Sequence, residues 1–373
     1  MAVLQEYLDW RADIPLSVSP FNDVDNLILA TLAYTGFDGI VPGGGEPVSL
    51  SFMCESFFQT HSKEEIRERG TQIERAPLLM DGMLSGARFG SLKACRYINE
   101  IDTDKSAQIS AVTFLLDDGT AYVAFRGTDS TLVGWKEDFN LSYLTETAGQ
   151  QRAVEYLNET AAEIPRPIRV GGHSKGGNFA VFASAFCSVQ DRILSVYSND
   201  GPGFRTEIVH SDAYRRILSK LVSIIPDTSI IGLLLASGAT PKVIKSSASG
   251  IQQHDPFTWC VMRDGFVPAE LSESGKIIDK TLDTWVEGMD DETRKSFTET
   301  VFSLFASTGA ETFHEIGRKK ARYAEVILAH LFALPKEKQA ELLLLARQLI
   351  QSGGQAAVSQ LPDLLLGNRI GKT

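Results

Sequence analysis

Residues 167–178 read Pro-Ile-Arg-Val-Gly-Gly-His-Ser-Lys-Gly-Gly-Asn, and these residues are the strongest indication of the fold. It contains the pattern Gly-x-Ser-x-Gly, with Gly172, Ser174 and Gly176 at the defining positions. A short β-like run precedes the pattern, and a run rich in small residues follows it. In that setting the pentapeptide turns a strand abruptly into a helix and raises the serine hydroxyl above the sheet. The flanking glycines are needed because the strand and the helix approach too closely for side chains. The stretch therefore predicts Ser174 as a nucleophile.

Strand and helix signals alternate on both sides of this turn. Alternation of this kind is typical of a parallel sheet with helices on both faces. Two short apolar runs before it, 109–116 and 121–125, are separated by Asp117-Asp118-Gly119 and predict a hairpin. The predicted strands then cover 167–170, 193–197 and 221–225, and the predicted helices cover 149–163, 176–186 and 212–220. The expected fold class is α/β, of the α/β-hydrolase type, with a mostly parallel sheet.

The flanking regions are predicted to be mainly helical. In the N-terminal part, helices are expected over 21–36, with Asn22 or Asp23 as the cap, and over 62–89. A late pair of strands is expected at 242–246 and 258–262. C-terminal helices are expected over 291–306, 311–334 and 336–352. We predict an N-terminal helical segment packed on the core (1–107), a catalytic core (108–265) and a C-terminal helical extension (266–373).

Composition excludes several classes of protein. The 373 residues carry a formal charge of −11 and show no dense Lys/Arg run, so nucleic acid is not an expected partner. The four cysteines form no Cys-x-x-Cys pair, and we expect buried thiols and no metal site. The N-terminus lacks a basic head followed by an apolar run, and the apolar stretch 229–236 is too short to span a bilayer. The expected compartment is the cytoplasm.

A serine nucleophile needs a general base, and His254 is the predicted one. Of the six histidines, His173 is too close to Ser174 to reach its hydroxyl, and His61 and His210 come too early in the chain. His314 and His330 fall in predicted helices. His254 lies in a polar loop before a strand-like run. The alternative is a loop histidine without a catalytic role.

Two aspartates qualify as the acid that orients the base. In this fold the triad follows the order Ser, acid, His, so the acid lies between 174 and 254 at the end of a strand. Asp227 follows the second predicted strand after the nucleophile, where the acid usually lies, and it is the preferred choice. Asp200 follows the first of these strands and is the alternative. Asp200 could also be only a turn residue at the start of Asp-Gly-Pro-Gly.

These elements together resemble the class-three (fungal-type) lipases and a related group of lipase-like bacterial proteins. The resemblance covers about residues 108–262. It rests on five elements in the family's order: Val123-Ala124-Phe125-Arg126-Gly127-Thr128, Trp135 with Asp138, Gly172–Gly176, Asp227, and His254 with Trp259. The sequence departs from the family at Gly134, at Lys175 and after Asp227. Lys175 would favour anionic substrates or point to solvent.

The resemblance implies an oxyanion hole formed by the backbone N–H groups of Lys175 and Thr128. It also implies an ester hydrolase that needs no cofactor and acts on a lipid or small-molecule ester. The alternatives are a thioesterase or amidase with the same triad, or a retired hydrolase core that acts as a scaffold through its C-terminal helices. Transient contact with a lipid surface and homo-oligomerisation through the C-terminal helices are further hypotheses.

Overall fold

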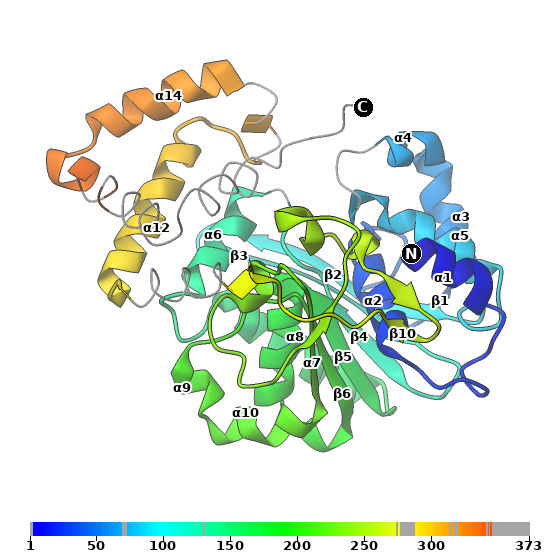
Figure 1. Cartoon of the computed structure of the whole chain (residues 1–373). Helices are drawn as coiled ribbons and strands as arrows, with labels where there is room; N and C mark the ends of the chain where they lie inside the picture. The colour runs from blue at the N-terminus through cyan, green and yellow to red at the C-terminus, as the bar shows by residue number, and fades with distance from the viewer. Residues whose placement is uncertain are drawn as a thin grey trace. The chain divides into compact units, whose positions relative to one another are not determined.

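The computed structural model describes residues 3–68, 73–129, 131–273, 275–276, 288–312, 315–316, 320–340, 342 and 344. Its helices are α1 Leu4–Arg11, α2 Asp23–Leu32, α3 Leu50–Thr60, α4 Lys63–Arg67, α5 Leu79–Leu84, α6 Leu132–Asn140, α7 Ala148–Glu163, α8 Lys175–Phe186, α9 Thr206–Val209, α10 Asp212–Ile217, α12 Asp291–Ala306 and α14 Lys320–Ala333 (Figure 1). Its strands are β1 Val48–Ser49, β2 Lys93–Asp102, β3 Ala107–Leu115, β4 Ala121–Phe125, β5 Ile168–His173, β6 Ile193–Asn199, β7 Leu221–Pro226, β8 Lys242–Ile244, β9 Val261–Met262 and β10 Gly265–Phe266.

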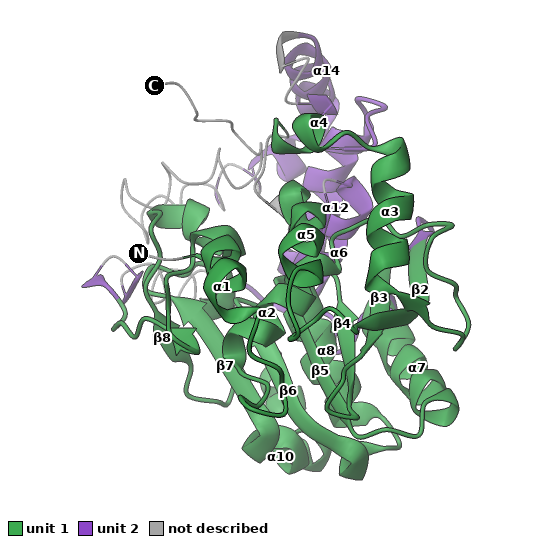
Figure 2. Ribbon diagram, turned by 90° about the vertical axis from the view of Figure 1, so that its right-hand side faces the viewer, with its two compact units in different colours: residues 1–100, 109–127, 149–271 green, residues 101–108, 128–148, 272–373 purple. Residues whose placement is uncertain are grey.

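The chain divides into two compact units, coloured separately in Figure 2. Unit 1 comprises residues 1–100, 109–127 and 149–271, and unit 2 comprises 101–108, 128–148 and 272–373. The domain boundaries at 107 and 265 stay a prediction. None of the helices in the described ranges combines the length and the apolar character that crossing a membrane requires.

Eight strands form one sheet whose spatial order, β1 to β8, follows the order of the chain. β3 and β4 pair antiparallel, as the predicted hairpin requires, and β4 through β8 run parallel to one another. Parallel strands need a crossover connection between them; α7, α8 and α10 lie in the connections from β4 to β7, and a 3₁₀ helix, Ile231–Leu233, lies in the connection from β7 to β8. The ends of β5, β6 and β7 therefore meet at one edge of the sheet, where the predicted nucleophile and both candidate acids follow their strands.

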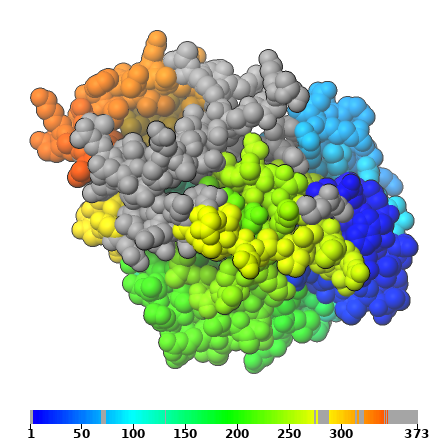
Figure 3. Space-filling view, in the orientation of Figure 1, coloured from blue at the N-terminus to red at the C-terminus, as the bar shows by residue number. Residues whose placement is uncertain are grey.

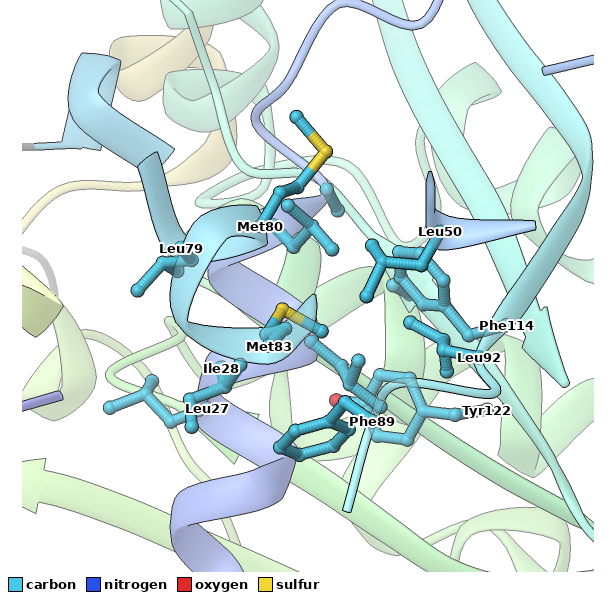
Figure 4. Packing of buried hydrophobic residues seen from close by; sticks show 14 of the residues in the cluster. Leu27, Ile28, Leu50, Leu79, Met80, Met83, Phe89, Leu92, Phe114 and Tyr122 are labelled. Carbon is cyan, nitrogen blue, oxygen red and sulfur yellow. The ribbon is translucent and has the colours of Figure 1, made fainter. Parts of the chain in front are cut away.

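Both faces of the sheet are apolar, which is why helices cover both of them. Along β4, Tyr122 and Ala124 join a cluster with α1, α2, α3 and α5, while Val123 and Phe125 join a cluster with α7, α8 and α10. Figure 4 shows the first cluster, in which Leu27 of α2, Met83 of α5 and Phe114 of β3 are packed together with their neighbours. The expected α/β-hydrolase fold is confirmed.

Outside the core, the structure corrects several predicted elements. In place of the one helix expected over 62–89, the described residues form α4, a 3₁₀ helix at Ile73–Leu78 that contains Pro77, and α5; a proline disfavours the regular helix in the residues just before it. β2 was not predicted. The strand at 258–262 shortens to β9, which pairs with β10 in a separate two-stranded sheet, whereas β8 joins the main sheet. Of the helix expected over 336–352, residues 341, 343 and 345–352 lie outside the described residues.

Unit 2 has its own small core. Leu132 of α6, Phe302 of α12 and Tyr323 of α14 are buried in one cluster. The backbone supports this packing, since Leu132 N donates to Glu311 O at 2.9 Å. The C-terminal helices α12 and α14 thus pack with α6 in a unit of their own.

The N-terminal segment of unit 1 is fixed to late parts of the chain. α2 begins at the expected cap, where Asn22 Oδ1 accepts from the N–H groups of Val24 and Asp25. Figure 3 shows this blue segment beside the yellow-green segment around residues 240–270. An ion pair between Lys242 and Asp23, 2.7 Å apart, joins the two segments.

A buried ion pair joins two parts of the N-terminal segment. Arg88 Nε donates to Asp25 Oδ1 at 2.7 Å, and neither side chain has any exposed surface. Arg88 also donates to three carbonyl oxygens, those of Ile14, Ser19 and Pro20. The guanidinium therefore forms hydrogen bonds with Asp25 and with three carbonyl groups of the loop before α2.

We expect Arg88→Met to lower the free energy of unfolding by about 3–5 kcal/mol, because it leaves a buried carboxylate without its partner. Urea unfolding followed by tryptophan fluorescence measures this change. The matched control is Arg215→Met, because the Arg215 side chain is 62% exposed in its ion pair with Asp212. The control should unfold like the parent. Equal midpoints for both variants would contradict the role assigned to Arg88.

Candidate functional site: a strained serine, a histidine and two aspartates

Ser174 occupies a strained turn between β5 and α8. Its backbone dihedrals are φ 57° and ψ −134°, a region that residues with a side chain rarely adopt. Residues 170–173 and 175–185 are all buried, whereas Ser174 between them is partly exposed. This is the sharp strand-to-helix turn that the Gly-x-Ser-x-Gly pattern predicts, and it presents the serine at the edge of the sheet.

The two glycines of the motif are there because the backbone leaves no room for a side chain. A Cβ at Gly172 would lie 2.3 Å from the carbonyl carbon and oxygen of Gly176. A Cβ at Gly176 would lie 2.1 Å from the carbonyl oxygen of Phe125. Both distances are far shorter than real Cβ contacts, so the close packing of β4, β5 and α8 demands glycine at both positions.

A hydrogen-bond network of buried amide and phenol groups holds the backbone next to the turn. Asn199 Nδ2 donates to Gly172 O at 3.0 Å, and Asn26 Nδ2 donates to Asn199 Oδ1 at 2.8 Å. Tyr122 Oη donates to Asn26 Oδ1 at 2.7 Å. Burial raises the pKa of the Tyr122 phenol well above its usual value, so the group stays a hydrogen-bond donor. The network fixes the backbone that carries the serine.

His254 and Asp200 form a hydrogen-bonded pair beside this turn. His254 ends a 3₁₀ helix, Gly250–His254, and its Nδ1 lies 2.7 Å from Asp200 Oδ2. Asp200 directly follows β6 and is 1% exposed. Its other oxygen, Oδ1, accepts from Ser229 Oγ and from Gly232 N at 3.1 Å. An ionised carboxylate accepts from Nδ1–H, which leaves Nε2 as the basic nitrogen of the neutral ring.

Asp227, the acid preferred from the sequence, does not contact the imidazole. Its Oδ1 accepts from Gln253 Nε2 at 2.7 Å, and Thr228 N donates to Gln253 Oε1 at 2.8 Å. The preference for Asp227 is therefore corrected in favour of the alternative, Asp200. The physical reason is the order of the strands: β6, which ends before Asp200, pairs with β5, whereas β7 lies one strand further from the nucleophile.

The structure brings the serine and the histidine–aspartate pair to one place. Ser174 N donates to the carbonyl oxygen of Asn199, the residue before Asp200, at 2.9 Å. The ring of His173, the residue before Ser174, lies with its centroid 4.5 Å from that of His254. No hydrogen bond joins Ser174 Oγ to His254 among the described residues.

The two predicted oxyanion residues fall in different units. Lys175 begins α8, so its backbone N–H belongs to the first turn of that helix. Its side chain is 1% exposed, and its Nζ lies 5.4 Å from the centre of the Phe179 ring, which corrects the alternative that it points to solvent. In unit 2, Thr128 Oγ1 donates to Asp138 Oδ2 at 2.6 Å. In unit 1, a Cβ on Gly127, the residue before Thr128, would lie 3.0 Å from Ser174 Cβ.

Three residues that contact the site were not predicted as part of it. Gln253 and Tyr34 were not candidates, and His173 was considered only as a possible base. His173 is buried, and its Nε2 donates to His254 O at 2.7 Å. The motif itself places His173 next to Ser174, whereas no sequence signal points to Tyr34. Of the other histidines, His61 stacks on Phe57 and His314 lies outside the described residues.

Within the described residues, no group of three or more His, Cys, Asp or Glu side chains is arranged to hold a metal ion. A hydroxyl on a strained turn and an imidazole oriented by a buried carboxylate are suited to nucleophilic attack with proton transfer.

Three solved structures are similar to this chain. Lipase II from Rhizopus niveus is 17% identical over 36% of this chain and 58% of that chain, with a TM-score of 0.28. The Lip2 lipase from Yarrowia lipolytica is 12% identical over 49% and 72%, with a TM-score of 0.33. The Rhizomucor miehei lipase–propeptide complex is 14% identical over 48% and 68%, with a TM-score of 0.31. This chain thus spans little more than half of the Rhizopus lipase.

No curated protein matches the chain. A model of the Mbeg1-like family matches residues 83–303, a segment that contains β3 through β8, Ser174, Asp200 and His254. Because this match covers more than half of the 373 residues, the chain belongs to the Mbeg1-like family.

Proposed function

We propose that this protein is a serine hydrolase that cleaves carboxylic esters through an acyl-enzyme on Ser174. The observation that carries the proposal is the combination of a serine in a strained, partly exposed turn with an imidazole held by a buried carboxylate. A strained backbone persists only where the surrounding structure supports it, and such sites cluster at functional positions. The intact His254–Asp200 pair favours an active hydrolase over a retired scaffold.

In the proposed first step, Ser174 Oγ attacks the ester carbonyl carbon while His254 Nε2 takes the hydroxyl proton. Asp200 accepts from Nδ1–H, keeps the required tautomer, and stabilises the imidazolium that forms. The tetrahedral intermediate then breaks its bond to the alkoxy oxygen. The alcohol leaves with the proton from His254, and the acyl group stays on Ser174.

In the second step, water attacks the acyl-enzyme with His254 again as the base, and the carboxylic acid and free Ser174 are released. The negative oxygen in both steps needs donors that are already in place. We assign one of these donors to the N–H group of Lys175, because Lys175 opens α8 directly after Ser174.

The proposed substrate has an apolar acyl or alcohol part, such as a lipid, a lysolipid or a small ester. A thioesterase or an amidase would use the same residues. A panel of nitrophenyl ester, acyl thioester and anilide with matched acyl chains separates these classes. The ester hydrolase should turn over the ester much faster than the anilide, and it should not prefer the thioester.

The experiment that tests the proposal is covalent labelling of the folded protein with a fluorophosphonate, followed by mass spectrometry of the peptides. Phosphonylation requires an activated serine, so we expect one adduct, on Ser174. Protein unfolded in urea before labelling is the control and should not react, because the triad no longer forms. An unlabelled folded protein, or an adduct on a different residue, would refute the proposal.

A further inference from the structure

His173 uses both nitrogens of its ring in hydrogen bonds, although it is 1% exposed. Its Nε2 lies 2.7 Å from the carbonyl oxygen of His254, and its Nδ1 lies 3.0 Å from Tyr34 Oη. A carbonyl oxygen only accepts, so Nε2 carries the hydrogen. In the neutral ring Nδ1 is then an acceptor, and the Tyr34 hydroxyl donates to it. Burial and the neighbouring His254 hold the pKa of His173 well below its usual value, which keeps the ring neutral.

The carbonyl that His173 binds belongs to the proposed general base. His254 is the last residue of the 3₁₀ helix Gly250–His254, where carbonyl groups lack partners within the helix. The His254 ring is held by Asp200, but a bond to Nδ1 alone leaves the backbone free to shift. The hydrogen bond from His173 Nε2 to the carbonyl oxygen of His254 holds the backbone of His254, while Asp200 holds its ring. The preceding residue is held separately, because Trp259 Nε1 donates to Gln253 O at 2.8 Å.

Tyr34, which donates to His173, is 139 residues away from it in the sequence. It lies two residues after the end of α2 and is only partly buried. A Cβ on Gly127 would lie 2.1 Å from Tyr34 Oη and 3.0 Å from Ser174 Cβ. The phenol oxygen is therefore close to the nucleophile as well as to His173. α2 itself packs against β5, so Tyr34 is supported by the sheet that carries Ser174.

We propose that Tyr34 and His173 are a positioning pair that holds the general base His254 in line with Ser174. The inference rests on the proposed function and adds two residues to it. His173 donates to the His254 carbonyl, and Tyr34 donates to Nδ1 and so holds the His173 ring in the orientation that allows this donation. Without the Tyr34 hydroxyl, the ring keeps only one of its two hydrogen bonds and can turn away from the carbonyl oxygen.

The test uses full-length His173→Phe, His173→Gln, Tyr34→Phe and the double variant Tyr34→Phe/His173→Phe. For each, kcat and KM for a nitrophenyl ester and the rate of fluorophosphonate labelling are measured. A misplacement of a reacting group by about 1 Å can cost about 100-fold in rate. We expect His173→Phe to lower kcat by about 10- to 100-fold and to leave KM within about twofold. Tyr34→Phe should lower kcat by a smaller factor and should also leave KM nearly unchanged.

Two comparisons separate positioning from a general structural role. The double variant should be no slower than His173→Phe alone, because Tyr34 acts through His173. His173→Gln should recover part of the loss, since its amide N–H can reach the same carbonyl. The matched control is Tyr156→Phe, which removes a buried hydroxyl that donates to Arg96 O at 2.6 Å. That variant should unfold more easily but keep the parent kcat.

Additive losses in the double variant, or a parent-like kcat in His173→Phe and Tyr34→Phe, would overturn the inference while leaving the proposed function standing. Failure of the parent protein itself to label would overturn both. Labelling of the parent protein therefore distinguishes failure of this inference from failure of the proposed function. Because Tyr34→Phe removes one oxygen at a partly exposed position, it supplies a result even where His173→Phe folds poorly.

Discussion

Replacing Ser174 with alanine is expected to lower kcat for a nitrophenyl ester by about 10⁴-fold or more. The hydroxyl is the atom that forms the acyl-enzyme, so its loss removes the whole covalent route. Any remaining turnover would come from binding and from the oxyanion donors acting on water. The fold should survive, because Ser174 is partly exposed and alanine adds no atoms to the crowded turn. The measurement is steady-state kinetics together with fluorophosphonate labelling, which should disappear.

A matched control lies on the helix that begins next to Ser174. Ser184 of α8 is buried, and its Oγ donates to Ala180 O at 2.7 Å. Ser184→Ala removes a serine hydroxyl from the same helix without touching the site, and it should retain the parent kcat. Ser174→Ala protein that retains more than a few per cent of the parent activity would show that another residue performs the chemistry.

The strained turn at Ser174 could be predicted because its signal is local. Within a few residues the sequence places a short strand, two glycines around a serine and a helix with small residues. The structure explains why each is needed, since a side chain at Gly172 or Gly176 would meet the backbone. The hairpin before it was also local, with β3 and β4 joined through a short turn. Such features require no knowledge of distant contacts.

The choice of acid could not be made from the sequence, because it depends on how the strands lie side by side. Counting strands after the nucleophile favoured Asp227, and a motif resemblance pointed to the same residue. In the sheet, however, β6 is the neighbour of β5, and the residue after β6 reaches the imidazole. Asp227 reaches Gln253, the neighbour of His254 in the chain. Asp200 therefore bonds His254 and Asp227 bonds its neighbour, and only the structure shows which aspartate meets the imidazole.

Long-range polar contacts were beyond sequence reasoning for a related reason. Tyr34 and His173 are 139 residues apart, and Asn26 and Asn199 are 173 residues apart. Nothing in the sequence around Tyr34 or Asn26 marks either residue, because both lie in or near an otherwise ordinary amphipathic helix. The helix was predicted, but its face toward β5 carries polar groups whose partners become visible only after folding.

Asp200→Asn and Asp227→Asn are expected to differ by orders of magnitude in kcat. Replacing the orienting aspartate of a Ser-His-Asp triad with asparagine lowers kcat by about 10⁴-fold, because the amide favours the wrong imidazole tautomer. We expect a loss of that order for Asp200→Asn, whose amide oxygen can still accept from Ser229 and Gly232 and so preserve the local fold. Asp227→Asn keeps an acceptor for Gln253 Nε2 and should lose less than about tenfold. The two variants control for each other. Each removes one negative charge, and the two charges lie at the ends of neighbouring strands, β6 and β7. An effect of lost charge alone would therefore lower kcat equally in both variants. Steady-state kinetics on both proteins decides the assignment: a large loss in Asp227→Asn with a small one in Asp200→Asn would return the role of the acid to Asp227.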